Sequence, residues 1–157
     1  MVMLNLKISM KKIATFFLFN LSIFIASTQT LNYADSILGD WQIGSGKARI
    51  QIKKSGLVYY GQISWLKNPV DDVGKPKVDK NNPNPTKRSI PLIGLRILLG
   101  FEYTGNNKWE NGTIYDPENG KTYNCIAELI NPNSLNVRGY LGSSIVGRTD
   151  KWTRISN

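Results

Sequence analysis

Apolar side chains recur at every second position in several short segments of this chain. Ala48, Ile50 and Ile52 alternate with charged and amide residues. The same alternation returns late in the chain, at Leu135, Val137, Gly139 and Leu141. A period of two places one row of side chains in a core and the other in water, as in a half-buried antiparallel strand. Little recurs at helical spacing, so we expect an all-β domain.

Turn-forming residues separate these segments and predict hairpins. Gly56 follows the first strand and precedes a second expected strand at 59–66, where its freedom to adopt a positive φ suits a tight turn. In the segment 112–123, Pro117 presets the φ of a turn, and Gly120 supplies the left-handed residue that leads into the next strand. We therefore predict one hairpin early in the domain and another at 112–123.

The segment 67–88 is the longest irregular part of the chain. Four of its residues exclude a helix and a central strand: Pro69, Pro76, Pro83 and Pro85. Loops of this length in a compact domain are usually functional or disordered, and both alternatives stay open here. The following segment 90–99 is apolar except for Arg96. It is compatible with an edge strand or with a cover over a barrel opening.

The N-terminal region has the pattern of an export signal. Lys11 and Lys12 precede the uncharged run 13–25, and small polar residues follow it. A basic end, a short apolar helix and small residues are typical of a segment that is removed after translocation. The alternative is a membrane span, but a bilayer core needs about 20 apolar residues, and Asn20 and Ser22 interrupt this shorter run.

This interpretation divides the chain into two parts. We expect 1–34 to be a signal peptide with a short leader, cleaved between positions 27 and 34, and 35–157 to be a single domain without a stable membrane span. The chain has a formal net charge of +9 at pH 7, and the segment 1–34 contains three lysines and no acids, so the domain keeps 9 − 3 = +6. Its basic residues come singly or in pairs. Such scatter is typical of a solvated surface, with a groove for an anionic partner as the alternative and no nucleic acid expected.

The absence of histidine and the presence of one cysteine exclude several chemistries. An internal disulfide and Ser-His-Asp catalysis are not available, and transition metals lack a plausible ligand set. The segment that begins at Asp79 resembles a calcium loop. The fifth, sixth and twelfth positions of such a loop need an oxygen ligand, glycine and an acid, but here they hold Pro83, Asn84 and Ile90. We expect neither a metal nor a cofactor.

Cys125 and the acidic residues also favour structural roles. Cys125 alternates with polar residues on the same side as Ala127 and Leu129, which is typical of a small core residue. Catalysis could then use only carboxylates. Asp116 and Glu118 fall in the expected turn, and no spacing indicates the facing pair that a glycosidase needs. A hydrolase that uses carboxylates alone is thus the least favoured function.

Aromatic residues are spread over the expected strands, together with one arginine in mid-strand. In a small barrel such rings mostly fill the interior, but some can line a pocket in which hydroxyls and a guanidinium orient a polar group. The candidates for a ligand-binding role are Trp65, Tyr115, Tyr123, Arg138 and Tyr140. The candidates for a lid over the pocket are Asp79, Asn82 and Pro83.

The two ends of the domain carry a pattern that predicts barrel closure. Trp41 follows Gly39 and Asp40 at the start of the first expected strand, and Arg154 ends the last one. This arrangement resembles the lipocalin-like, or calycin, pattern, in which an arginine near the C-terminus covers a tryptophan of the first strand. We therefore expect Trp41 and Arg154 to close one end of an antiparallel barrel.

Further blocks of the sequence resemble those of a bacterial exported family, domain of unknown function 2147. The most specific of these blocks are Ile-Tyr-Asp-Pro-Glu-Asn-Gly-Lys-Thr-Tyr at 114–123 and Arg-Gly-Tyr at 138–140. The resemblance runs from about Gly39 to Arg154. It implies a small exported β-barrel-like domain of uncharacterised activity, and the family has no agreed catalytic residues to carry over.

We therefore predict a lipocalin-like antiparallel barrel of about eight strands, closed or nearly closed, in the periplasm or outside the bacterial cell. Its predicted role is to bind a small apolar or amphipathic ligand inside the barrel. The alternative is a cell-envelope interaction module with a solid core, whose basic surface meets anionic lipid, cell-wall polymer or another protein.

Overall fold

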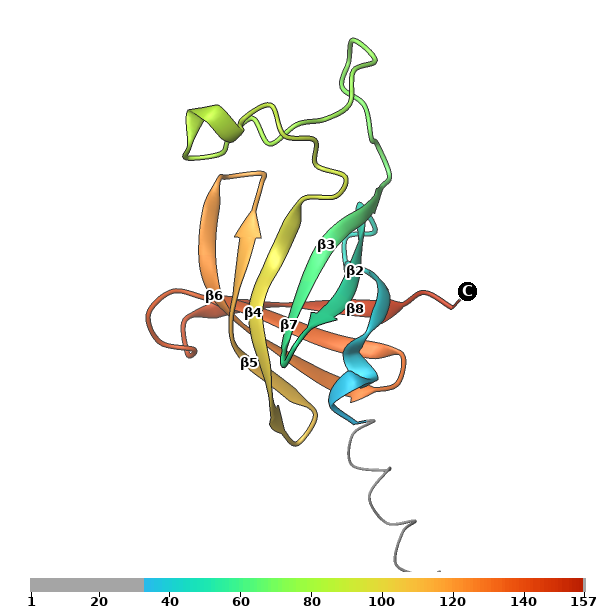
Figure 1. The fold of residues 1–157 in the computed structure, drawn as a ribbon, viewed down its shortest axis with the longest axis vertical. Coiled ribbons are helices and arrows are strands. Elements are labelled where there is room, and N and C mark those ends of the chain that lie inside the picture. Colours follow the sequence, from blue (N-terminus) through green and yellow to red (C-terminus); the bar gives the residue numbers. More distant parts are fainter. Residues whose placement is uncertain (1–32, 157) are drawn as a thin grey trace, which may run out of the picture. The chain divides into compact units, whose positions relative to one another are not determined.

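Eight antiparallel strands close into a barrel in the computed structural model, which describes residues 33–156 (Figure 1). The predicted signal run 13–25 lies outside the described residues. Among the residues described, no helix is long and apolar enough to cross a membrane. In chain order the elements are η1 (Ala34–Ile37), β1 (Gly39–Gln42), β2 (Ala48–Ser55), β3 (Val58–Leu66), η2 (Pro85–Lys87), β4 (Arg96–Gly105), β5 (Lys108–Asp116), β6 (Lys121–Asn131), β7 (Ser134–Tyr140) and β8 (Gly147–Arg154).

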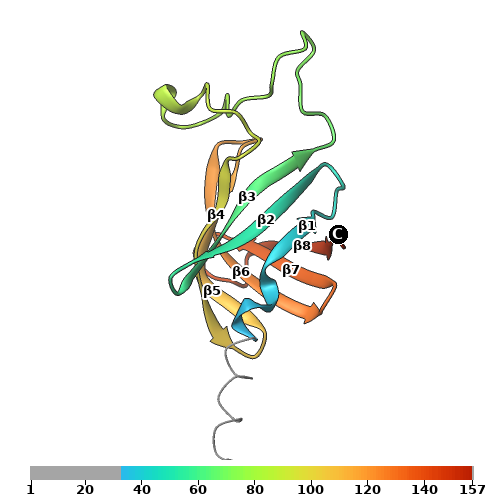
Figure 2. The same ribbon diagram turned by 45° about the vertical axis from the view of Figure 1, so that its right-hand side comes forward.

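The first and last strands complete the barrel. Each strand pairs with the next in the chain, and β1 pairs with β8 through Trp41 opposite Arg154 and Gln42 opposite Thr153 (Figure 2). Closure pairs backbone groups that a sheet edge would otherwise expose. The prediction of an all-β, closed antiparallel barrel of eight strands is confirmed.

The period-two alternation corresponds to buried rows in the strands. The buried members are Ala48, Ile50 and Ile52 in β2, and Leu135 and Val137 in β7. Leu141 departs from the expected row, since β7 ends at Tyr140, which pairs with Gly147. Leu141 therefore lies in the turn to β8 and is 62% exposed. The expectation that Leu141 continues the buried row is wrong, because the alternation holds only while the strand is paired.

The hairpin expected at 112–123 is present as β5, a turn, and β6. The N–H of Gly120 donates to the carbonyl oxygen of Asp116 at 2.8 Å, and Gly120 has a φ of +71°. The Asp116 carboxylate accepts from the backbone N–H of Glu118 at 2.8 Å. Asp116 therefore stabilises the turn, as aspartate commonly does at this position.

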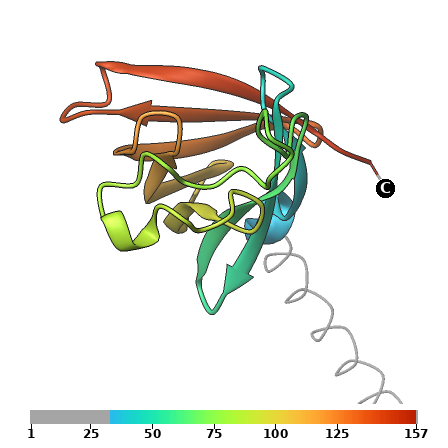
Figure 3. The same cartoon turned by 90° about the horizontal axis from the view of Figure 1, so that it is seen from above.

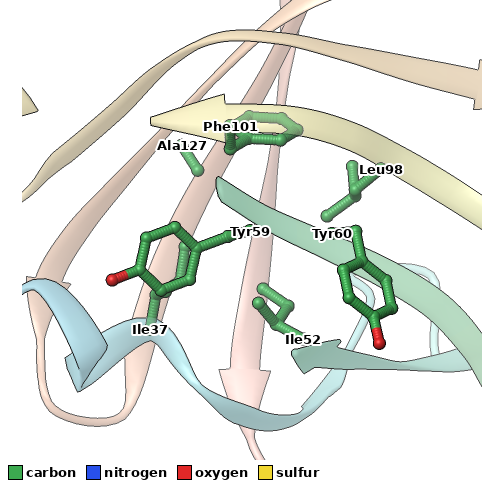
Figure 4. Close-up of a pocket in the computed structure, with 7 residues that line it drawn as sticks. All are labelled: Ile37, Ile52, Tyr59, Tyr60, Leu98, Phe101 and Ala127. Atoms are coloured by element: carbon green, nitrogen blue, oxygen red, sulfur yellow. The ribbon is translucent and has the colours of Figure 1, made fainter. Parts of the chain in front are cut away.

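Large side chains fill the barrel interior. Trp41 and Trp109 are fully buried, Trp152 is nearly so, and Tyr59 stands edge-on to Trp109 with ring centroids 6.3 Å apart. A cavity between these interior side chains and Tyr60 has a volume of about 10 Å³, which is at most the space of one water molecule. Its lining is shown in Figure 4 and comprises Ile37, Ile52, Tyr59, Tyr60, Leu98, Phe101 and Ala127. The barrel thus has a solid core.

Two small residues complete this packing. A Cβ atom on Gly112 would overlap the ring of Phe101, so β5 can approach β4 here only with glycine. Cys125 is fully buried, and burial raises the pKa of its thiol to about 12. Cys125 is therefore the small core residue that the alternation predicts, and it is protected from thiolate chemistry.

The segment 34–38, which contains η1, plugs one end of the barrel. Ile37 is 2% exposed, and its carbonyl oxygen accepts from the indole N–H of Trp41 at 2.9 Å. The carbonyl oxygen of Ala34 accepts from the indole N–H of Trp109 at 3.1 Å. Cleavage after Ala34, the last position of the predicted range, would remove this acceptor from a fully buried indole.

Asp35 ties the plug to β2 and β3. Its carboxylate accepts from the ammonium of Lys54 and from the hydroxyl of Tyr59, both at 2.6 Å. The hydrogen bond from Lys54, followed by that from Tyr59, lowers the pKa of Asp35. A carboxyl with a lowered pKa stabilises the folded state above its unfolded pKa, and this contribution is lost as the pH falls through the folded pKa.

We expect the Asp35→Asn variant to show a weaker loss of stability in acid than the unchanged protein. The difference should develop below about pH 4, where an unperturbed aspartate takes up its proton. Urea unfolding at pH 6 and at pH 3 measures it, with the exposed Asp72→Asn as a matched control that keeps the original acid dependence. Equal losses in the Asp35→Asn variant and the unchanged protein would exclude this role of Asp35.

The strap, which we define as residues 67–95 between β3 and β4, crosses the other end of the barrel (Figure 3). Two isolated β-bridges fold it back on itself, Val70 with Pro76 and Val78 with Pro91. Leu92 and Leu95 pack against the core. The segment 90–99 covers the barrel end up to Leu95, as one alternative predicted, and continues as β4 from Arg96 onward. The other alternative, an edge strand, is wrong, because β4 pairs with β3 on one side and with β5 on the other.

Candidate functional site

A buried carboxylate attaches the strap to the barrel wall. Asp79 is 0% exposed, and its carboxylate accepts from the Tyr115 hydroxyl at 2.7 Å and from the Asn82 side-chain amide at 2.6 Å. Burial, and then the hydrogen bond to Asp79, raise the pKa of Tyr115 to about 12. We call Asp79, Asn82 and Tyr115 the latch. Of the predicted lid residues, Asp79 and Asn82 belong to the latch, while Pro83 is exposed beside it.

The strap also rests on the turn between β5 and β6. The side-chain amide of Asn81 donates to the carbonyl oxygens of Pro117 and Glu118 at 3.1 and 2.9 Å. Gly120 lies directly under the Asn81 carbonyl, where any side chain would collide with the strap. The β5–β6 hairpin therefore holds the strap at two places, through Tyr115 on β5 and through the turn that contacts Asn81.

The strap is basic. It contains six cations, Lys67, Lys75, Lys77, Lys80, Lys87 and Arg88, and three acids, Asp71, Asp72 and Asp79. Two of the acids are engaged, since Asp79 is buried in the latch and the Asp71 carboxylate accepts from the backbone N–H groups of Val73 and Lys75. The ion pairs among the described residues join Lys47, Lys54 and Lys108 to acids, so none of them involves a strap cation.

Apolar side chains project between these cations. Those on the strap are Val70, Val73, Ile90 and Ile93, with exposed fractions of 46, 77, 38 and 50%. The basic residues look scattered in the sequence, because they are separated along the chain. The excess of cations over acids within a long proline-rich loop is the signal that could have identified this surface.

Trp65 lies on the outside of the barrel. A bulge between β2 and β3 sets Trp65 opposite Arg49, and the guanidinium of Arg49 lies 4.8 Å from the ring centroid. Trp65 is 37% exposed, whereas its neighbour Leu66 packs against the core. The indole therefore stacks with a surface arginine and does not line the barrel interior.

Arg138 lies on the outer face of β7 and holds the turn to β8. Its guanidinium donates to the carbonyl oxygens of Ser144 and Ile145 at 2.9 and 3.1 Å, and to the Thr149 hydroxyl at 3.0 Å. It borders an outer groove of about 210 Å³ between β5 and β8. Lys108 in the same groove lies 3.9 Å from Glu128, so the charges there are largely matched within the protein.

The three predicted tyrosines take separate places near the strap end. Tyr115 reaches the latch, the Tyr123 hydroxyl accepts from the side-chain amide of Asn119 at 3.1 Å, and Tyr140 is partly buried at the end of β7. None of them lines the interior cavity or the outer groove. The five predicted ligand-binding residues are therefore not gathered around one cavity, and a binding role for each stays a prediction.

The two predicted closure residues lie in contact at the plugged end. The Arg154 guanidinium is 4.2 Å from the ring centroid of Trp41. Its nitrogens donate to the carbonyl oxygens of Leu38 and Pro132, each at 2.6 Å, and to that of Ser36. Burial lowers the pKa of Arg154. One side chain thus joins β8 to the plug, to β1 and to the turn between β6 and β7.

Among residues 33–156, no cluster of three or more histidine, cysteine, aspartate and glutamate side chains could hold a metal ion. The strap surface, with its attachment to the latch, is the candidate functional site. It offers cations and apolar side chains on a fixed backbone, which suits binding rather than covalent chemistry.

Comparisons with known proteins give a family and a fold. The bacterial family described as "Uncharacterized protein conserved in bacteria (DUF2147)" matches residues 39–154. A solved structure, protein HP1028 from Helicobacter pylori, described as belonging to the lipocalin family, is similar with a TM-score of 0.68 and 23% identity. The similarity covers 76% of this chain and 83% of that one. No curated protein matches the chain.

Proposed function

Because this chain belongs to the bacterial family DUF2147 and folds into a barrel with a filled interior, we propose that it is an exported interaction module. Its partner is an anionic component of the bacterial cell envelope, which it binds with the outside of the barrel. The observation that carries this proposal is the volume of the interior cavity, about 10 Å³. Pockets for small molecules are commonly about 300 to 1,000 Å³.

The packing of the interior side chains opposes enlargement of the cavity for an apolar ligand. Trp109 is fully buried, with its indole N–H bound to the plug and its ring packed against Tyr59 and Tyr103. Moving this ring to make room for a ligand would also break its hydrogen bond. Both changes oppose the close packing that stabilises a protein core.

The basic surface supports the choice of an anionic partner. The strap has three more cations than acids, and none of the ion pairs among the described residues involves a strap cation. Of these cations, Arg88 also donates to the carbonyl oxygen of Asn82 at 2.8 Å. An excess of unpaired positive charge attracts polyanions and anionic surfaces, and it does so more strongly at low ionic strength.

The test measures two kinds of binding by the exported protein: binding of an apolar probe inside the barrel and binding of a polyanion to its surface. We expect native mass spectrometry to give the mass of the ligand-free chain, and the apolar fluorophore N-phenyl-1-naphthylamine to show no stoichiometric uptake. Retention on an immobilised polyanion should fall several-fold between about 20 and about 150 mM salt, as the Debye length shortens. A co-purifying small molecule, or saturable uptake of the fluorophore at one site, would overturn the proposal and restore interior binding.

A further inference from the structure

We propose that the strap docks this end of the barrel onto a bilayer that contains anionic lipid. The strap cations contact the lipid phosphates, and the exposed valine and isoleucine side chains enter the interface between headgroups and acyl chains. This inference rests on the proposed function and deepens it, because it names both the surface and the partner.

The acids of the strap do not neutralise its cations. Asp79 is buried beneath the strap, and Asp71 is occupied by two backbone N–H groups of its own turn. The six cations therefore face little opposing charge on the strap itself. The ion pairs near the two ends use cations outside the strap, since Lys54 pairs with Asp35 at 2.6 Å at the plugged end and Lys47 pairs with Glu118 at 3.8 Å beside the strap. The charge pattern selects the strap end as the one that meets an anionic surface.

The exposed apolar side chains of the strap favour a bilayer over a soluble polyanion as the anionic partner. Val73 is 77% exposed at the tip of the hairpin that Val70 and Pro76 bring together. In Figure 1 this hairpin projects beyond the strands at the top of the barrel. A soluble polyanion would leave Val73 in water, whereas a bilayer interface accepts apolar side chains that are flanked by cations.

The backbone of the strap is already ordered before it meets a partner. The latch fixes Asp79 to β5, and Asn81 is bound to the turn between β5 and β6. Four prolines further restrict the chain between 69 and 85. Docking then requires little ordering of the backbone, so a small number of contacts is sufficient for reversible binding.

Co-sedimentation of the full chain with vesicles tests the charge of the strap. We expect binding to phosphatidylethanolamine–phosphatidylglycerol vesicles, weakening with salt, and little binding to phosphatidylcholine vesicles. The double variant Lys75→Glu/Lys80→Glu should lower the partition coefficient about tenfold, because reversed charges are repelled by the anionic leaflet. Lys53→Glu/Lys151→Glu, on β2 and β8, makes the same change in net charge and should lower it by less than about twofold.

A fluorophore at the tip tests insertion. Val73→Cys labelled with nitrobenzoxadiazole should brighten and shift to shorter wavelength on anionic vesicles. Leu57→Cys is the matched control, because Leu57 is 86% exposed in the turn between β2 and β3, near the plugged end. The native Cys125 is buried and stays unlabelled. We expect no spectral change at position 57.

The outcomes separate this inference from the proposed function. Equal losses in the two double variants, or equal spectral changes at positions 73 and 57, would overturn docking by the strap. Salt-sensitive binding to soluble inorganic polyphosphate without binding to vesicles would overturn the bilayer as partner and leave the proposed function intact. A small molecule retained inside the protein, with binding neither to polyphosphate nor to vesicles, would overturn both.

Discussion

Replacing Arg154 with alanine is expected to lower the free energy of unfolding by about 3 kcal/mol, because hydrogen bonds from a charged group each contribute about 1.5 to 3 kcal/mol and the site is partly exposed. The guanidinium donates to three carbonyl oxygens and covers the Trp41 ring. It is also the side chain that joins the last strand to the plug. Its loss therefore leaves carbonyl groups without a partner and uncovers a large apolar ring.

Urea unfolding followed by tryptophan fluorescence measures this effect. Arg154→Lys keeps the charge but cannot reach three carbonyls at once, so we expect it to recover less than half of the loss. Arg148→Ala, on the exposed part of β8, is the control and should change the stability by less than about 0.5 kcal/mol. If Arg154→Ala were as stable as this control, closure by backbone pairing alone would be sufficient.

Replacing Asp79 with alanine is expected to detach the strap from the barrel and to lower the free energy of unfolding by about 2 to 4 kcal/mol, since one buried and one partly buried donor lose their acceptor. These donors are the Tyr115 hydroxyl and the Asn82 side-chain amide. Asp79→Asn should be milder, because its carbonyl oxygen can still accept from Tyr115. Its amide group, however, would face the Asn82 amide, where two donors meet.

Two measurements distinguish release of the strap from general unfolding. Limited proteolysis of Asp79→Ala should cut within 67–95 before the strands are attacked, and the spectrophotometric pKa of Tyr115 should fall from about 12 toward its ordinary value of about 10. Asp72→Ala, on the same strap, should change neither result. Protection of the strap equal to that of the unchanged protein would show that Asn81 and the bridges hold it without the latch.

Release of the strap in Asp79→Ala should also affect the proposed docking to vesicles. In Asp79→Ala the cations remain, but the backbone that presents them is no longer fixed by the latch. Binding to anionic vesicles should then weaken although the charge of the outer surface is unchanged.

Much of the fold could be predicted because its causes are local. Alternation at Ala48, Ile50 and Ile52 forms a strand wherever one face meets a core, and Pro117 with Gly120 encodes a tight turn. The blocks at 114–123 and 138–140 indicated the family, and the match over residues 39–154 confirms it. These features depend on neighbours within about ten residues.

The position of Trp65 shows where a local pattern fails. Counting by twos from the buried Ile63 places Trp65 in the interior. The bulge opposite Arg49 and Ile50 inserts one residue into β3 and reverses the alternation after Ser64, so that Leu66 faces the core. One extra residue turns every later side chain to the other face. The cause is the pairing of two strands, which a single strand's sequence does not reveal.

The sequence by itself determined that this chain forms short antiparallel strands, where its clearest hairpin turns, and to which family it belongs. Only the tertiary structure decided that the interior is solid, because the free volume of a barrel depends on how rings from distant strands, such as Tyr59 and Trp109, pack together. It also decided that cations separated along the strap share one surface, because the latch and the bridges fold that segment across the barrel end.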